Sequence, residues 1–160
     1  MGLFDRFRQT KKAAQSISDP VFGELKGDSS GSWSGSIAFS PAGRTVRVLI
    51  HADGSNPAEV HQRAYNDLSR RYAQLRPAIG DALFALWKPW LDQIPDKKRS
   101  AVLPHSADQV LAQTQLESIA IEHDGSLVLG YAFATSGVWD DAVLNVGLKD
   151  WVPRPVGVDD

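Results

Sequence analysis

The sequence predicts an α+β domain, in which an antiparallel sheet of five to six strands is covered on one face by a long helix. Apolar and polar residues alternate with a period of two near the start and in the last third of the chain, and a helical stretch lies between these regions. Tight turns join most of the predicted strands, which favours antiparallel pairing. Because the helical stretch is separate from the runs of strands, we expect it to form its own layer.

A β-hairpin is the clearest early feature. Residues 33–39 and 44–51 both alternate, and the four residues Ser40-Pro41-Ala42-Gly43 between them suit a type I turn. A short strand over 21–25 is expected before the hairpin, with an unprotected edge. The core is expected to contain Trp33, Ile37, Phe39, Val46, Val48, Ile50, Leu68, Leu129, Tyr131, Phe133 and Val146.

The central stretch predicts two helices. Asn56 is expected to be the N-cap of the first, with Pro57 at its first helical position. An apolar stripe then indicates a helix over 57–76. Pro77 is expected to end or kink this helix, and a second apolar helix is expected over 79–87. A capping-box pattern predicts that a third, short helix begins after Ser106.

The last third of the chain returns to strands. Its predicted strands are 116–122, 127–133, 143–149 and an edge strand or tail over 151–158. One domain over 21–152 is expected, with an N-terminal helix or arm in residues 1–20 and a tail over 153–160. Residues 2–17 are typical of a short helix with apolar and basic positions, so contact of residues 2–12 with anionic lipid is an alternative to a plain terminal helix.

Composition excludes several classes of function. The chain has no cysteine, which removes disulfides, cysteine-based zinc sites and a thiol nucleophile, and fits a cytoplasmic location. The net charge is −2, and residues 1–12 carry four basic side chains against one acidic, which leaves −5 on the remainder. An acidic body argues against nucleic-acid binding, which depends on clustered Lys and Arg.

Histidines at two predicted strand ends are the candidates for chemistry. If these ends lie close together, His51, Asp53, His123 and Asp124 provide imidazole and carboxylate groups for proton transfer or for a divalent metal. Turn formation by the two Asp-Gly pairs is the alternative explanation. Common nucleotide, zinc-protease and hydrolase motifs are missing, so no cofactor and no metal are expected.

Tryptophans are the candidates for binding. Trp87, Trp90, Trp139 and Trp151 are more large aromatic residues than a core of this size needs, and exposed Trp is typical of binding hot spots. For Trp87, burial in the core is the favoured alternative, because this residue lies on an apolar helix face. These tryptophans favour a weak homodimer or a different protein partner.

A further pattern resembles a family of uncharacterised bacterial domains, some of which occur among immunity proteins of toxin systems. It comprises Phe22-Gly23-x-Leu25, Trp33-x-Gly35 and the later Ile119-Ala120-Ile121-x-x-Asp124-Gly125-x-Leu127-x-Leu129-x-Tyr131. The resemblance implies a cytosolic interaction protein and carries no functional residue over. A binding module is therefore favoured, with a small enzyme and a peripheral membrane adaptor as the alternatives.

Overall fold

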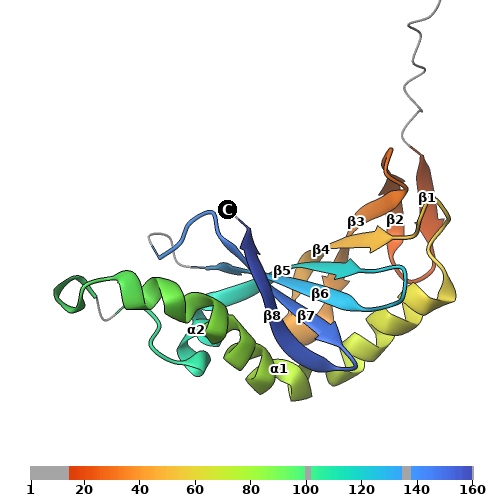
Figure 1. Ribbon diagram of the computed structural model, residues 1–160. Helices are drawn as coiled ribbons and strands as arrows, with labels where there is room; N and C mark the ends of the chain where they lie inside the picture. Colours follow the sequence, from red (N-terminus) through yellow and green to blue (C-terminus); the bar gives the residue numbers. More distant parts are fainter. Residues whose placement is uncertain (1–14, 100–101, 135–137, 160) are drawn as a thin grey trace, which may run out of the picture.

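The computed structural model describes residues 15–99, 102–134 and 138–159 (Figure 1). Within these residues, eight strands form one sheet, and the order of the strands in the sheet is their order in the chain. The strands are β1 (Ser16–Asp19), β2 (Gly23–Gly27), β3 (Ser32–Phe39), β4 (Arg44–His51), β5 (Thr114–Ile121), β6 (Leu127–Phe133), β7 (Val143–Lys149) and β8 (Val152–Asp159). Neighbouring strands are antiparallel except for β4 and β5, which are parallel. The predicted fold class is confirmed, but the prediction of five to six strands is wrong.

The β3–β4 hairpin confirms the sequence prediction. Its turn contains a short 3₁₀ helix over Ser40–Ala42, after which Gly43 adopts a φ of 66° and its N–H donates to the Ser40 carbonyl. Glycine suits this left-handed conformation because it has no Cβ. Val46, Val48 and Ile50 are all buried, so the predicted register is correct. Two members of the predicted core, Ile37 and Phe133, are only partly buried.

Two strands at the N-terminal edge differ from the expectation. Ser16 and Ile17 belong to β1, so the helix predicted over 2–17 does not extend to them, and the rest of that prediction lies outside the described residues. The Asp19 carboxylate accepts the backbone N–H groups of Val21 and Phe22, and this closes the β1–β2 turn. The edge strand is therefore β1, and the segment predicted as the edge lies one strand further in.

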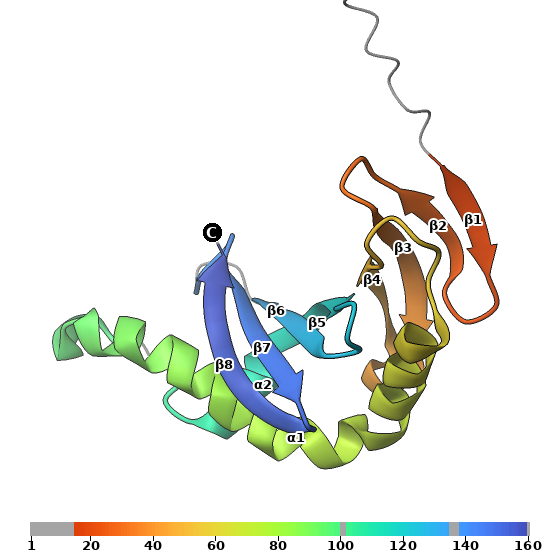
Figure 2. The ribbon, with the colours of Figure 1, turned by 45° about the vertical axis from the view of Figure 1, so that its right-hand side comes forward.

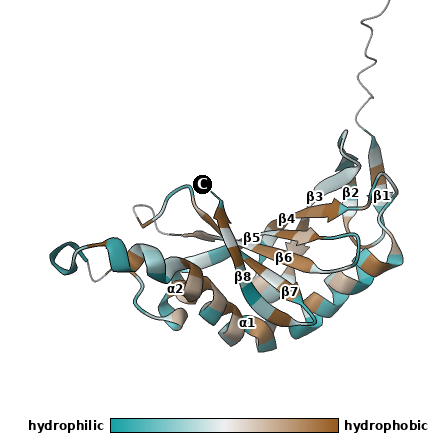
Figure 3. Ribbon diagram, in the orientation of Figure 1, coloured by the Kyte–Doolittle hydropathy of each residue, from teal (hydrophilic) through white to brown (hydrophobic). Residues whose placement is uncertain are grey.

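One continuous helix, α1 (Glu59–Gln93), replaces the two predicted helices. Pro77 lies inside it, so the prediction that the helix ends at Pro77 is wrong. Buried residues continue at helical spacing on both sides of Pro77, from Leu68 and Tyr72 to Ile79 and Leu83. Pro77 is exposed, so its ring and the backbone hydrogen bond that it removes lie on the solvent side of α1. The solvent side is the convex side of a helix that curves around a core. Figure 3 shows hydrophobic and hydrophilic residues alternating along α1.

The caps of the helices are partly as predicted. Ala58 is the N-cap of α1, so the prediction of Asn56 is wrong by two residues. The reason is that His61 Nδ1 accepts the Ala58 N–H at 2.9 Å, which supplies the reciprocal bond of a capping box from a histidine. For α2 (Ala107–Gln113), the Ser106 hydroxyl accepts the Gln109 N–H, which confirms the predicted cap.

The helix and the sheet form two layers. Figure 2 shows α1 running beneath the sheet, with the strands at the two ends of the sheet rising on either side of β5 and β6. Large apolar side chains face α1. The register aligns Ser34, Leu49, Ala120, Val128 and Gly147 in one row on the other face, where most side chains are small. The core therefore lies on one side of the sheet only.

A buried pair of tyrosines joins the centre of α1 to the sheet. The hydroxyls of Tyr72 and Tyr131 lie 2.9 Å apart and form a hydrogen bond. Both residues are almost fully buried. Burial, and then the neighbouring Tyr72, raise the pKa of Tyr131 well above the ordinary tyrosine value. Tyr131 is therefore neutral in the folded protein.

Removal of both hydroxyls of this pair is expected to cost less than the sum of the two single removals. Tyr72→Phe leaves the buried Tyr131 hydroxyl without its partner, so the free energy of unfolding should fall by about 1–3 kcal/mol. The double variant Tyr72→Phe/Tyr131→Phe leaves no orphaned hydroxyl and should lose less than the sum of the single variants. Urea denaturation of the four proteins measures these losses. Strictly additive losses would show that the two hydroxyls are not coupled.

Alkaline pH is expected to destabilise the fold through Tyr131. The unfolded chain loses the tyrosine proton near pH of about 10, whereas the raised pKa keeps this proton in the folded state. Stability is therefore fully present below about pH 10 and falls above it, by about 1.4 kcal/mol per pH unit for this one group. Tyr131→Phe should show a shallower decline by that amount in denaturation series at increasing pH. Parallel declines of the two proteins would contradict the assignment.

Candidate functional site

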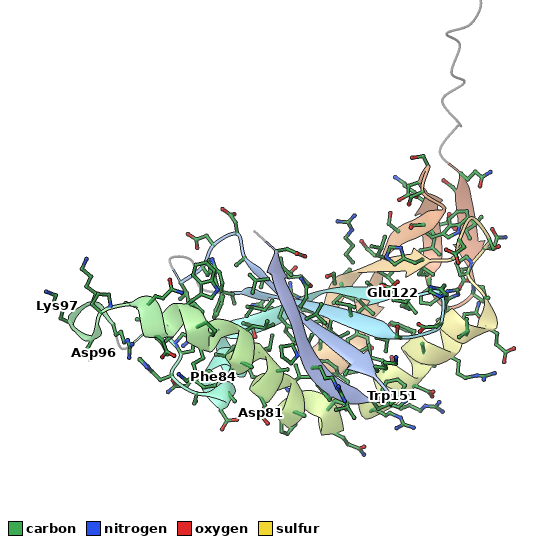
Figure 4. All side chains as sticks on the ribbon, in the orientation of Figure 1. Asp81, Phe84, Asp96, Lys97, Glu122 and Trp151 are labelled. Atoms are coloured by element: carbon green, nitrogen blue, oxygen red, sulfur yellow. The ribbon has the colours of Figure 1, made fainter. Side chains whose placement is uncertain are left out.

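The histidine candidates lie where the two central strands, β4 and β5, end. Because β4 and β5 are parallel, His51, the last residue of β4, and Glu122, which follows β5, lie at the same end of these strands, where Figure 4 labels Glu122. His51 Nε2 lies 3.9 Å from a Glu122 carboxylate oxygen, and His51 Nδ1 lies 3.0 Å from the Ser32 hydroxyl. The structure thus pairs His51 with Glu122, a partner that the sequence did not single out.

The aspartates of this candidate group are turn residues. Asp124 accepts hydrogen bonds from the hydroxyl and the backbone N–H of Ser126, and these bonds hold the pKa of Asp124 below its usual range. Asp53 has a φ of 48° in the turn after β4. Within residues 15–99, 102–134 and 138–159, no group of three or more His, Asp or Glu side chains is placed to hold a metal ion. The geometry favours the turn explanation.

Three of the four candidate tryptophans lie together. Trp87 and Trp90 come from the C-terminal part of α1, and Trp139 comes from the segment between β6 and β7. The ring centroids of Trp90 and Trp139 are 4.7 Å apart, and those of Trp87 and Trp139 are 5.7 Å apart. Phe133 also contacts Trp87, edge to face. We call Trp87, Trp90, Trp139 and Phe133 the tryptophan cluster.

The cluster extends from the core to the surface. Trp87 is 2% exposed, and its Nε1–H donates to the Pro104 carbonyl at 2.8 Å, so the core alternative is correct for this residue. Trp139 is partly buried and packs against the core. Trp90 is 46% exposed. The buried indole of Trp87 therefore packs against the partly buried Trp139, which in turn packs against the exposed Trp90.

Trp151 lies elsewhere. It belongs to the two-residue turn between β7 and β8, where Asp150 and Trp151 both have positive φ. The Arg71 guanidinium lies 4.8 Å from the centroid of its ring, a cation–π contact that holds Trp151 against α1. Figure 4 shows Trp151 beside the middle of α1, far from Asp96 and Lys97 that follow the end of this helix. The prediction of Trp151 as a partner-binding residue has no support from its position.

Acidic side chains border the tryptophan cluster. Asp140 and Asp141 follow Trp139 directly and are exposed. Lys88 and Asp92, on either side of Trp90 in the sequence, form a salt bridge with each other. Lys88 and Asp92 therefore largely compensate each other, and the exposed Asp141 adds an acidic side chain to this border.

Comparison with known proteins adds no assignment. No family model matches the chain, and no curated protein or solved structure matches it either. No helix among the described residues is long and apolar enough to cross a membrane. The proposed lipid contact of residues 2–12 lies outside the described residues and stays a prediction.

Substitution of Trp87 is expected to lower the free energy of unfolding much more than substitution of Trp90. Trp87→Ala should lower the free energy of unfolding by about 3–5 kcal/mol, because it leaves a cavity and removes the bond to Pro104. Trp90→Ala should cost less than about 1 kcal/mol, since the side chain is half exposed. Urea denaturation of both variants measures the difference. Equal losses would mean that Trp90 serves the fold rather than the surface.

Proposed function

We propose that this protein binds a protein partner through the tryptophan cluster. The observation that carries the proposal is Trp90, which is 46% exposed and yet held by contact with Trp139. Exposed tryptophan provides a large contact area with few rotatable bonds, and tryptophan is among the residues most enriched in binding hot spots. An indole held in place before binding also loses less conformational entropy when the partner arrives.

The support beneath Trp90 favours a preorganised surface. Trp139 contacts both Trp87 and Trp90, and Trp87 is fixed by its hydrogen bond and by Phe133. These contacts come from α1, β6 and the segment before β7, so three parts of the chain hold one surface residue. Such convergence is typical of a rigid anchor site.

The charges around the cluster favour a basic partner. The exposed Asp141 borders it, and the chain beyond residues 1–12 carries a net charge of −5. An acidic surface speeds encounter with a basic protein and disfavours acidic ones. An immunity-like role, in which the chain binds a basic cytosolic toxin, combines these properties with the family resemblance of the sequence.

Affinity capture with matched variants tests the proposal. The full chain, Trp90→Ala and Val60→Ala are immobilised and exposed to lysate of the source cells, and bound proteins are identified by mass spectrometry. Val60 is the control because it is an exposed apolar residue at the other end of α1. We expect a stoichiometric partner with the full chain and with Val60→Ala, and an affinity for Trp90→Ala that is at least about 30-fold lower.

Equal capture by all three proteins would place the contact outside the tryptophan cluster. Capture by none of them, together with turnover in a broad substrate screen, would favour an enzyme instead. Light scattering over a range of concentrations tests whether the partner is a second copy of this chain. A monomeric mass at every concentration would exclude the homodimer.

A further inference from the structure

A concave site lies where the parallel strands β4 and β5 separate. Their pairing extends from Arg47 and Ser118 to Ile50 and Ile121, so the first residues of both strands are not paired with each other. In its pairing with β6, β5 also carries a β-bulge between Leu116 and Ser118. A pocket of about 400 Å³ occupies this region. Its lining comes from the β3–β4 turn, the middle of α1, α2 and the start of β5.

Arg44 spans the gap between the separated strands. Its guanidinium forms a salt bridge with Glu117 and donates to the Gln115 side chain, both on β5. Its Nε is buried, however, and has no hydrogen-bond partner among the described residues. A buried donor without an acceptor is costly, so the hydrogen bonds of Arg44 within the chain do not satisfy this side chain fully.

Arg76 brings a second guanidinium to the same pocket from α1. Within the described part of the chain, its side chain forms no salt bridge and no hydrogen bond, and it is exposed. Its charge acts on the tyrosine pair, since it lowers the pKa of Tyr131 against the larger effect of burial. The guanidinium of Arg76 therefore remains available to a ligand.

One member of the tyrosine pair forms part of the wall of this pocket. The two hydroxyls carry two hydrogens, and the bond between Tyr72 and Tyr131 uses one of them. Tyr72 lines the pocket. The Thr114 hydroxyl, by contrast, already donates to the Val110 carbonyl. Arg76 therefore provides the unpaired donors of the pocket lining, and the Arg44 guanidinium adds a second positive charge beside it.

We propose that this pocket binds a small organic oxyanion, either a carboxylate or a phosphate monoester. Arginine matches both head groups because its planar guanidinium can donate two parallel hydrogen bonds. Leu111 and Leu116 provide an apolar wall beside the charged groups. The site is separate from the tryptophan cluster, since Trp90 lies about 21 Å further along α1.

Titration with two probes at constant ionic strength tests this site. Benzoate represents a carboxylate and phenyl phosphate a phosphate monoester, and both carry the same apolar ring. Two-dimensional ¹H–¹⁵N NMR spectra of the full chain should show saturable shifts for the backbone amides of Gly43, Arg44, Gln115 and Leu116. The probe with the higher affinity identifies the head group.

Two arginine variants give the decisive comparison. Arg76→Gln should weaken binding of the better probe at least tenfold. Arg70→Gln, which removes an exposed arginine paired with Asp67 on the same helix, should leave the affinity unchanged. The same spectra show that each variant is folded. Absence of saturable shifts with both probes would overturn the proposal, as would equal affinity of the full chain and Arg76→Gln.

Discussion

The parallel pairing of β4 with β5 is the constraint on which the rest of the structure depends. Two parallel neighbours cannot be joined by a tight turn, because the chain must return along the sheet before the second strand begins. Here α1 and α2 make this return. At 35 residues, α1 is about 52 Å long and therefore passes under both four-stranded halves of the sheet. The crossover fixes which face of the sheet is covered and thus where the core forms.

One residue of α1 links the two halves. Tyr72 contacts Phe39 of β3 edge to face and hydrogen-bonds Tyr131 of β6. On the N-terminal side, Tyr65 packs against Phe22 and Phe39, while on the C-terminal side Trp87 packs against Phe133. A helix broken at Pro77 would divide these contacts between two independent elements. The buried stripe on both sides of Pro77 thus outweighs the single backbone hydrogen bond that proline removes.

Local patterns in the sequence were sufficient to predict most of the strands. They were not sufficient to predict the number of strands or the continuity of α1 through Pro77. The β3–β4 hairpin, β6 and β7 follow from alternation and turn residues, which are properties of neighbouring positions. The helix through Pro77 depends on long-range packing that no local signal carries. The apolar face of the helix favoured burial of Trp87, but the cluster that Trp87 and Trp90 form with Trp139 and Phe133 could not be predicted, because it joins distant parts of the chain. His61 as a capping residue was missed since histidine is not the usual residue of a capping box.

Both surface features that suggest function occur where regular strand pairing stops. The tryptophan cluster forms beside the segment that leaves β6, and the arginine pocket forms where β4 and β5 have not yet met. In a paired sheet, backbone groups satisfy one another and side chains alternate strictly between two faces. Where pairing ends, side chains from α1 and from loops converge, as Arg76 and Arg44 do in the pocket. The crossover that builds the core therefore also determines where binding groups gather, since α1 passes beneath both places.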